Sequence, residues 1–91
     1  MKRGQIWWCQ FEPPDKRRPV VVLTRSAVVP YLTQVTVAPV TSRIRGLPTE
    51  VAVGPRHGLA VPSVVNMDLV QTVAKARMVE QIGALDEAQL R

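Results

Sequence analysis

The sequence predicts a mainly β protein, a small antiparallel β-barrel with short peripheral helices, and three observations lead to this fold class. The chain has 91 residues, so we expect a single domain over residues 1–91. Its β-branched and aromatic residues fall into five short runs, and helical patterns are few. The eight prolines and five glycines lie between these runs as turn residues. Several short strands separated by such turns favour a barrel.

Three of the predicted strands lie in the N-terminal half. Residues 5–11 are rich in aromatic side chains and predict a first strand, which ends at the polar, proline-containing loop of residues 12–18. Residues 19–24 form a continuous β-branched run typical of a buried central strand, and Pro19 is tolerated at a strand start. Residues 34–40 alternate between polar and apolar side chains and predict a third strand.

Two further strands are expected in the C-terminal half. A basic loop over residues 41–48 leads to a predicted fourth strand at residues 49–53, which a Gly-Pro pair ends. Residues 63–73 are β-branched enough for a fifth strand, although the apolar spacing near their end also suits a helix. Both interpretations of that segment stay open at this point.

The last residues resemble the start of a helix. Asp86 is a suitable N-cap, and Gln89 occupies the position of a capping-box partner. The pattern stops at Arg91 after barely one turn, so we expect a C-terminal helix that is truncated. Such a short helix is stable only when it docks on another element.

The charge of the chain is strongly basic. Lys and Arg number 12 against 7 Asp and Glu, which gives a net charge of +5 and a pI near 10.4. A basic surface attracts phosphate groups, and a solvated basic face without a ligand is the alternative. No uncharged apolar stretch is long enough to span a bilayer, and nothing resembles a signal peptide. We therefore expect a cytoplasmic protein with no membrane partner.

Several catalytic chemistries find no support in the residues present. The single cysteine, Cys9, and the single histidine, His57, cannot build a zinc site, and the scattered carboxylates do not suggest a magnesium site. We expect no metal and no cofactor, because a phosphate-binding glycine loop is also missing. Cys9 is expected to be a small buried apolar side chain rather than a reactive thiol. His57 is expected to be a surface loop residue, although a Ser/His/Asp arrangement would have to use it.

An arginine and two hydroxyls remain as candidate chemistry. Arg18 opens the second predicted strand, and Thr41-Ser42 follow the third. If both strands lie in one sheet, their ends can meet at one rim and present a guanidinium and hydroxyls to a phosphate. The alternative is that Arg18 only solvates a strand end and that Thr41-Ser42 forms a turn.

Six segments, in chain order over nearly the whole length, resemble sequence blocks of the MazF/PemK family of endoribonuclease toxins. They are Gly4-Gln5-Ile6-Trp7-Trp8, Arg18-Pro19-Val20-Val21-Val22, Val37-Ala38-Pro39-Val40-Thr41-Ser42, Arg45-Gly46-Leu47-Pro48-Thr49-Glu50-Val51, Ser63-Val64-Val65-Asn66-Met67-Asp68 and Lys75-Ala76-Arg77. The common order of the six blocks makes the resemblance specific. The chain departs from the family in a shorter first loop and in the missing remainder of the C-terminal helix.

The resemblance implies the MazF/CcdB-like plasmid-toxin fold, a homodimer and inhibition by an acidic antitoxin. It implies selective cleavage of single-stranded RNA without a metal, through attack of the 2′-OH on the adjacent phosphate. The family's catalytic arginine falls on Arg18 and its catalytic threonine on Thr41. Contact with RNA is carried onto Lys16, Arg17, Ser42, Arg43 and Arg45. Two alternatives remain, a CcdB-like gyrase poison that cuts nothing and a non-catalytic RNA-binding barrel.

Overall fold

The computed structural model of the chain describes residues 1–12 and 16–90. These residues form seven strands: β1 (Gln5–Gln10), β2 (Arg17–Val22), β3 (Gln34–Thr41), β4 (Glu50–Val53), β5 (Ser63–Asn66), β6 (Gln71–Ala74) and β7 (Met78–Ala84). Four one-turn 3-10 helices connect them: η1 (Val29–Tyr31), η2 (Pro55–His57), η3 (Met67–Leu69) and η4 (Lys75–Arg77). No described helix is long and apolar enough to cross a membrane.

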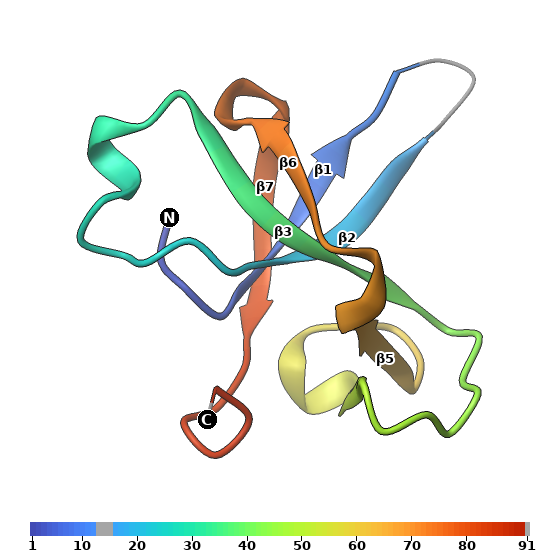
Figure 1. Cartoon of the computed structure of the whole chain (residues 1–91). Coiled ribbons are helices and arrows are strands. Elements are labelled where there is room, and N and C mark those ends of the chain that lie inside the picture. Colours follow the sequence, from blue (N-terminus) through green and yellow to red (C-terminus); the bar gives the residue numbers. More distant parts are fainter. Residues whose placement is uncertain (13–15, 91) are drawn as a thin grey trace.

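The eight-residue strand β3 organises the sheet (Figure 1). On one side it pairs with β2, and on the other side it pairs with β6 near its start and with β5 near its end. The strand order is therefore β4-β5-β3-β2-β1-β7, with β6 beside β3, and every pair is antiparallel. The sheet curls into a half-barrel with few helices, which confirms the predicted mainly β fold class.

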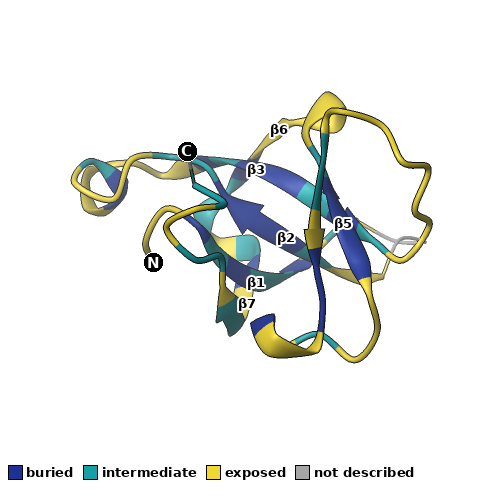
Figure 2. Cartoon of the chain, turned by 90° about the horizontal axis from the view of Figure 1, so that it is seen from below, coloured by how far each residue is buried: buried dark blue, intermediate teal, exposed yellow. Residues whose placement is uncertain are grey.

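Two hydrophobic clusters lie on the two faces of this sheet. In β2, Val20 and Val22 belong to one cluster and Val21 to the other, and all three are completely buried. This confirms the prediction of a central strand buried on both sides, and Figure 2 shows the buried residues running along β2 and β5. Cys9 is also fully buried in the first cluster, as expected of a small apolar side chain.

The prediction of one strand over residues 63–73 is wrong, and so is the helical alternative. The structure has two short strands there, β5 and β6, separated by η3. The Asn66 side chain accepts a hydrogen bond from the Asp68 backbone N–H at 2.9 Å, which favours a turn after β5. The chain therefore leaves one end of β3 and returns to pair with its other end.

Strand β7 was not predicted from the sequence at all. Its burial pattern shows one buried residue followed by three exposed ones, without the alternation that identifies a strand. It is an outer strand that pairs with β1, and its register shifts between Ile6 and Trp7 and again between Trp8 and Cys9. Bulges of this kind break the alternation of side chains between faces.

The C-terminal segment forms a single turn rather than a helix within the described residues. Its predicted capping pair is present, because the Asp86 N–H donates to Gln89 Oε1 and the Gln89 N–H donates to Asp86 Oδ1, both at 3.0 Å. The Gln89 side chain also donates to the Ala52 carbonyl at 2.7 Å. This contact docks the turn beside β4.

Candidate active site

The pairing of β2 with β3 brings the two predicted catalytic residues together. The register aligns Val20 with Pro39. The pairing ends there, and Arg18 and Thr41 each lie two residues beyond this last pair, at the adjacent ends of the two antiparallel strands. Both residues line the same two surface hollows. The strand ends therefore meet at one rim, as predicted.

Two hollows flank the Arg18–Thr41 pair. The first, here the tryptophan hollow, measures about 420 Å³ and has Trp8, Lys16, Arg17, Ser42, Leu59 and Val61 in its wall. The second, here the glutamate hollow, measures about 270 Å³ and has Arg43, Arg45, Glu50, Asn66 and Leu69 in its wall. All seven residues that the sequence assigned to catalysis or RNA contact thus line one hollow or both.

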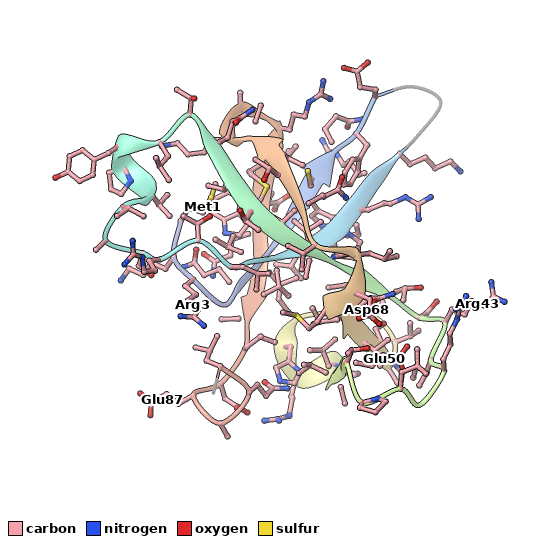
Figure 3. The ribbon with its side chains drawn as sticks, in the orientation of Figure 1. Met1, Arg3, Arg43, Glu50, Asp68 and Glu87 are labelled. Carbon is pink, nitrogen blue, oxygen red and sulfur yellow. The ribbon has the colours of Figure 1, made fainter. Side chains whose placement is uncertain are left out.

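The positive charge of this surface is concentrated in five side chains, here called the cationic rim: Lys16, Arg17, Arg18, Arg43 and Arg45. All five residues are exposed. Figure 3 shows Arg43 at the outer end of the loop after β3, with its guanidinium pointing away from the sheet. Glu50 is the one acidic residue among those that line the two hollows.

Thr41 is half-buried and has a local hydrogen bond of its own. Its Oγ1 accepts the Arg43 backbone N–H at 3.1 Å, and this local bond agrees with the alternative prediction of a turn at Thr41-Ser42. Accepting this bond uses an oxygen lone pair and leaves the hydroxyl hydrogen available. The turn therefore fixes the hydroxyl while it retains a donor for a phosphate oxygen.

Glu50 is a site residue that the sequence analysis missed. Its Oε1 accepts backbone N–H groups of the basic loop from Arg45 at 3.1 Å, from Gly46 at 2.8 Å and from Leu47 at 3.2 Å. Gly46 has φ +75°, a conformation that glycine adopts without strain. The carboxylate thereby holds the segment between Arg43 and β4. The sequence signal that could have identified Glu50 is an acidic residue shortly after the Gly46-Leu47-Pro48 turn.

Residues 2–91 match the family model described as "PemK-like, MazF-like toxin of type II toxin-antitoxin system". The chain belongs to this family. A curated relative, the endoribonuclease MazF3 of Mycobacterium tuberculosis, is 54% identical over 71 residues, which are 78% of this chain and 69% of that protein. The probable endoribonuclease MazF5 of the same organism is 43% identical over 91 residues, covering 98% of this chain and 82% of the relative.

Solved structures of MazF-like toxins share the fold. The Mycobacterium tuberculosis toxin MazF-mt6 is 48% identical, with a TM-score of 0.87 over 93% of this chain and 83% of that one. An endoribonuclease in complex with its cognate antitoxin, from a mycobacterial species, is 26% identical, with a TM-score of 0.84 over 99% of this chain and 84% of that one.

Other cations of this MazF-like chain have structural partners. Arg77 pairs with Glu12 at 2.6 Å and donates to the Gln10 carbonyl at 3.2 Å, which ties η4 to the end of β1. The Lys75 ammonium donates to the Val29 carbonyl at 3.0 Å. The Lys-Ala-Arg block therefore has a structural role, and the cationic rim lies elsewhere.

The prediction that His57 is a surface loop residue is wrong. His57 is only 5% exposed, because η2 packs against β7 so closely that a Cβ at Gly83 would overlap the His57 carbonyl oxygen. Its Nδ1 accepts the Gly54 backbone N–H at 3.1 Å. It lines a separate hollow of about 410 Å³ that includes none of the predicted site residues. A catalytic group built on His57 is therefore absent from the rim.

Metal-binding clusters are likewise missing from the structure over residues 1–12 and 16–90. No three His, Cys, Asp or Glu side chains in these ranges lie close enough to hold an ion. The residues described at the candidate active site are Arg18 and Thr41, the surrounding cations and Glu50.

Proposed function

We propose that this MazF-like chain is an endoribonuclease toxin that cleaves single-stranded RNA at the Arg18–Thr41 pair. The observation that carries the proposal is the position of this pair between two hollows on a surface with five cations. The relatives support the reaction class, since MazF3 is named an endoribonuclease and MazF5 a probable endoribonuclease. A strand of unpaired RNA fits such a surface, because its phosphates bind the cations and its bases enter the hollows.

The proposed reaction is an internal transesterification. The RNA 2′-oxygen attacks the adjacent phosphorus, the bond from phosphorus to the 5′-oxygen breaks, and the products are a 2′,3′-cyclic phosphate and a 5′-OH. The 2′-OH loses one proton and the leaving oxygen gains one, so the step balances. DNA lacks the 2′-OH and is not a substrate.

Arg18 and Thr41 have complementary roles in this mechanism. The Arg18 guanidinium stabilises negative charge on the pentacovalent phosphate with two donors, and it stays protonated throughout. The Thr41 hydroxyl donates to a second phosphate oxygen and positions it. Lys16, Arg17 and Ser42 bind the strand on one side of the pair, and Arg43 and Arg45 bind it on the other side. We propose that the reaction is metal-independent and sequence-selective.

An acidic antitoxin and a second copy of the chain complete the proposal. One similar structure contains an endoribonuclease with its cognate antitoxin, and another is a MazE–MazF pair from Deinococcus radiodurans. By analogy, we propose that an acidic partner covers the cationic rim and that the active toxin is a homodimer. Long-range charge attraction would make capture by such a partner fast.

The decisive experiment uses the purified chain, a long single-stranded RNA and excess chelator. We expect cleavage to persist in the chelator, because the proposed chemistry uses no metal, and to leave 2′,3′-cyclic phosphate and 5′-OH ends. Mapping of the ends then tests sequence selectivity. Activity that the chelator abolishes and magnesium restores would contradict the mechanism, and intact RNA under all conditions would contradict the function.

A further inference from the structure

Trp8 is a large aromatic residue that neither hydrophobic cluster includes. Its neighbour Trp7 packs against the first cluster, and the Trp7 indole N–H donates to Gln5 Oε1 at 3.0 Å. Trp8 is half-buried and lies on β1 between Pro19 of β2 and Glu80 of β7. Because neither hydrophobic cluster contains the Trp8 ring, we expect this ring to act at the surface.

The alternation of side chains along β1 accounts for this placement. Trp7 and Cys9 belong to the first cluster and Ile6 to the second, so Trp8 lies on the same face of the sheet as Ile6. The extra residues of the irregular β1–β7 pairing lie in β7, and β1 keeps its alternation. The Trp8 side chain accordingly lines the tryptophan hollow, together with Arg17 and Arg18.

The lining of the tryptophan hollow suits one nucleotide of a single-stranded nucleic acid, that is, one base and its phosphate. Cations line one part of its wall, whereas Leu59 and Val61 make another part apolar. Its volume of about 420 Å³ lies within the range of about 300–1,000 Å³ that is usual for ligand sites. Proteins that bind single strands combine a cationic track with aromatic rings on which bases stack.

We propose that the tryptophan hollow is a nucleobase subsite in which one unpaired base stacks on Trp8, beside the phosphate held by Arg18 and Thr41. The inference deepens the proposed function and relies on it for the identity of the polymer. Stacking on an indole tolerates every base, so Trp8 contributes affinity and places the strand. An apolar side chain of a protein partner is the competing occupant.

The test measures binding rather than cleavage. The chain has two tryptophans, so the Trp7→Phe variant reports the fluorescence of Trp8 alone. The ligands are a 2′-O-methyl RNA oligonucleotide, which cannot be cleaved, and an abasic strand of equal length and charge. We expect the oligonucleotide to quench Trp8 emission and the abasic strand to bind more weakly without quenching.

Substitution of Trp8 supplies the matched comparison. We expect Trp8→Leu to weaken oligonucleotide binding about 5- to 150-fold, the effect of losing one stacked base, and to leave abasic binding unchanged. Trp8→Phe keeps a smaller ring and should regain part of the affinity, whereas Trp7→Phe should change it little. Circular dichroism of each variant checks the fold.

Three results would overturn the subsite, and they are separable from failure of the proposed function. Equal binding of base-containing and abasic strands, or unchanged affinity in Trp8→Leu, rejects stacking even when RNA is still cut. Quenching by an acidic peptide with apolar residues, but not by the oligonucleotide, assigns the hollow to a protein partner. Base-dependent quenching without any RNA cleavage supports the subsite while contradicting the proposed reaction.

Discussion

Arg18 and Thr41 differ in how the protein holds them. The Arg18 side chain is exposed at the start of β2, whereas the Thr41 hydroxyl is half-buried and bonded to the backbone of its own turn. An exposed arginine adapts to a charge that develops during the reaction, while a fixed hydroxyl contributes positioning. Neither side chain belongs to a hydrophobic cluster, so both can be replaced without a cavity in the core.

Replacement of these two residues should therefore affect cleavage and spare stability. We expect Arg18→Ala to abolish detectable RNA cleavage and Thr41→Ala to slow it by about 10- to 1,000-fold, the usual effect of losing one oxyanion contact. Initial rates on a fluorescent RNA measure the loss, and thermal unfolding checks the fold. Arg25→Ala, at an exposed arginine outside both hollows, is the matched control. Parent-like rates in both test variants would refute the assignment.

The burial of Cys9 leads to a second prediction at this scale. Desolvation raises the pKa of its thiol, and the charge of Arg77 opposes the rise more weakly. Since the thiolate is the reactive form, we expect an aromatic disulfide reagent to modify the native chain more than about tenfold more slowly than the urea-unfolded chain. Absorbance of the released thiol gives both rates. Equal rates would show that the core around Cys9 opens readily.

At the level of whole elements, the sequence predicted strands where patterning and burial agree. The runs that became β1, β2, β3 and β4 were located because they carry continuous or alternating apolar residues that end at Gly/Pro turns. Strand β7 was not predicted, because an outer strand with bulges loses the alternation of apolar and polar side chains. The division between β5 and β6 depends on a local turn at Asn66 and on pairing with the two ends of β3, and this pairing is a tertiary feature.

The candidate site, like the fold, could be predicted from the sequence only in part. Their positions at strand ends made Arg18 and Thr41 candidates and the family resemblance assigned their roles, but their position at one rim required the pairing of β2 with β3. Glu50 was missed because its partners are backbone groups of a loop whose path the sequence does not define. His57 was misplaced because its burial depends on the unpredicted strand β7.

The C-terminal turn should respond to acid. The Gln89 backbone N–H, and next the Arg56 side chain, lower the pKa of the Asp86 carboxyl below its ordinary value of 3.8, although partial desolvation opposes them. A lowered pKa means that the ionised carboxylate stabilises the fold fully above about pH 4. This contribution is lost as pH falls through the lowered pKa of the folded chain.

Variants of the turn can measure this contribution. We expect Asp86→Ala to lower the melting temperature near neutral pH, and the difference from the parent to shrink progressively below pH 3.8. Melting curves at a series of pH values give the comparison. Glu87→Ala, at the adjacent exposed acid, is the control. A difference that stays constant from pH 7 to pH 2 would exclude the carboxylate as its source.

At the scale of the whole molecule, the distribution of charge matters more than its sum. The net charge is +5, and the cationic rim gathers five of the 12 basic residues beside the two hollows. Other cations are engaged in structure, as Arg56 is with Asp86 and Arg77 with Glu12. An RNA strand and an acidic protein tail would therefore bind the same surface.

Competition follows from this shared surface. We expect an acidic antitoxin that binds this chain to displace RNA and to block its cleavage. Each rim cation should contribute up to about 0.7 to the slope of log affinity for RNA against log salt. Fluorescence anisotropy of labelled RNA, titrated with the partner at several salt concentrations, tests both expectations. A ternary complex that cuts RNA at the full rate would disprove the shared surface.

The pairing of β1 with β7 also has a consequence for the timing of synthesis. A ribosome working at about 5–20 residues per second makes β1 (Gln5–Gln10) roughly 3–14 s before it begins β7 (Met78–Ala84). During that interval one edge of β1 lacks its strand partner, and such an edge pairs readily with other chains. The segments that carry the cationic rim are residues 16–18 at the start of β2 and residues 43–45 in the loop after β3, and both are complete much earlier in translation. A binding partner that recognises only this rim therefore meets its target on a growing chain, before β7 has covered the open edge.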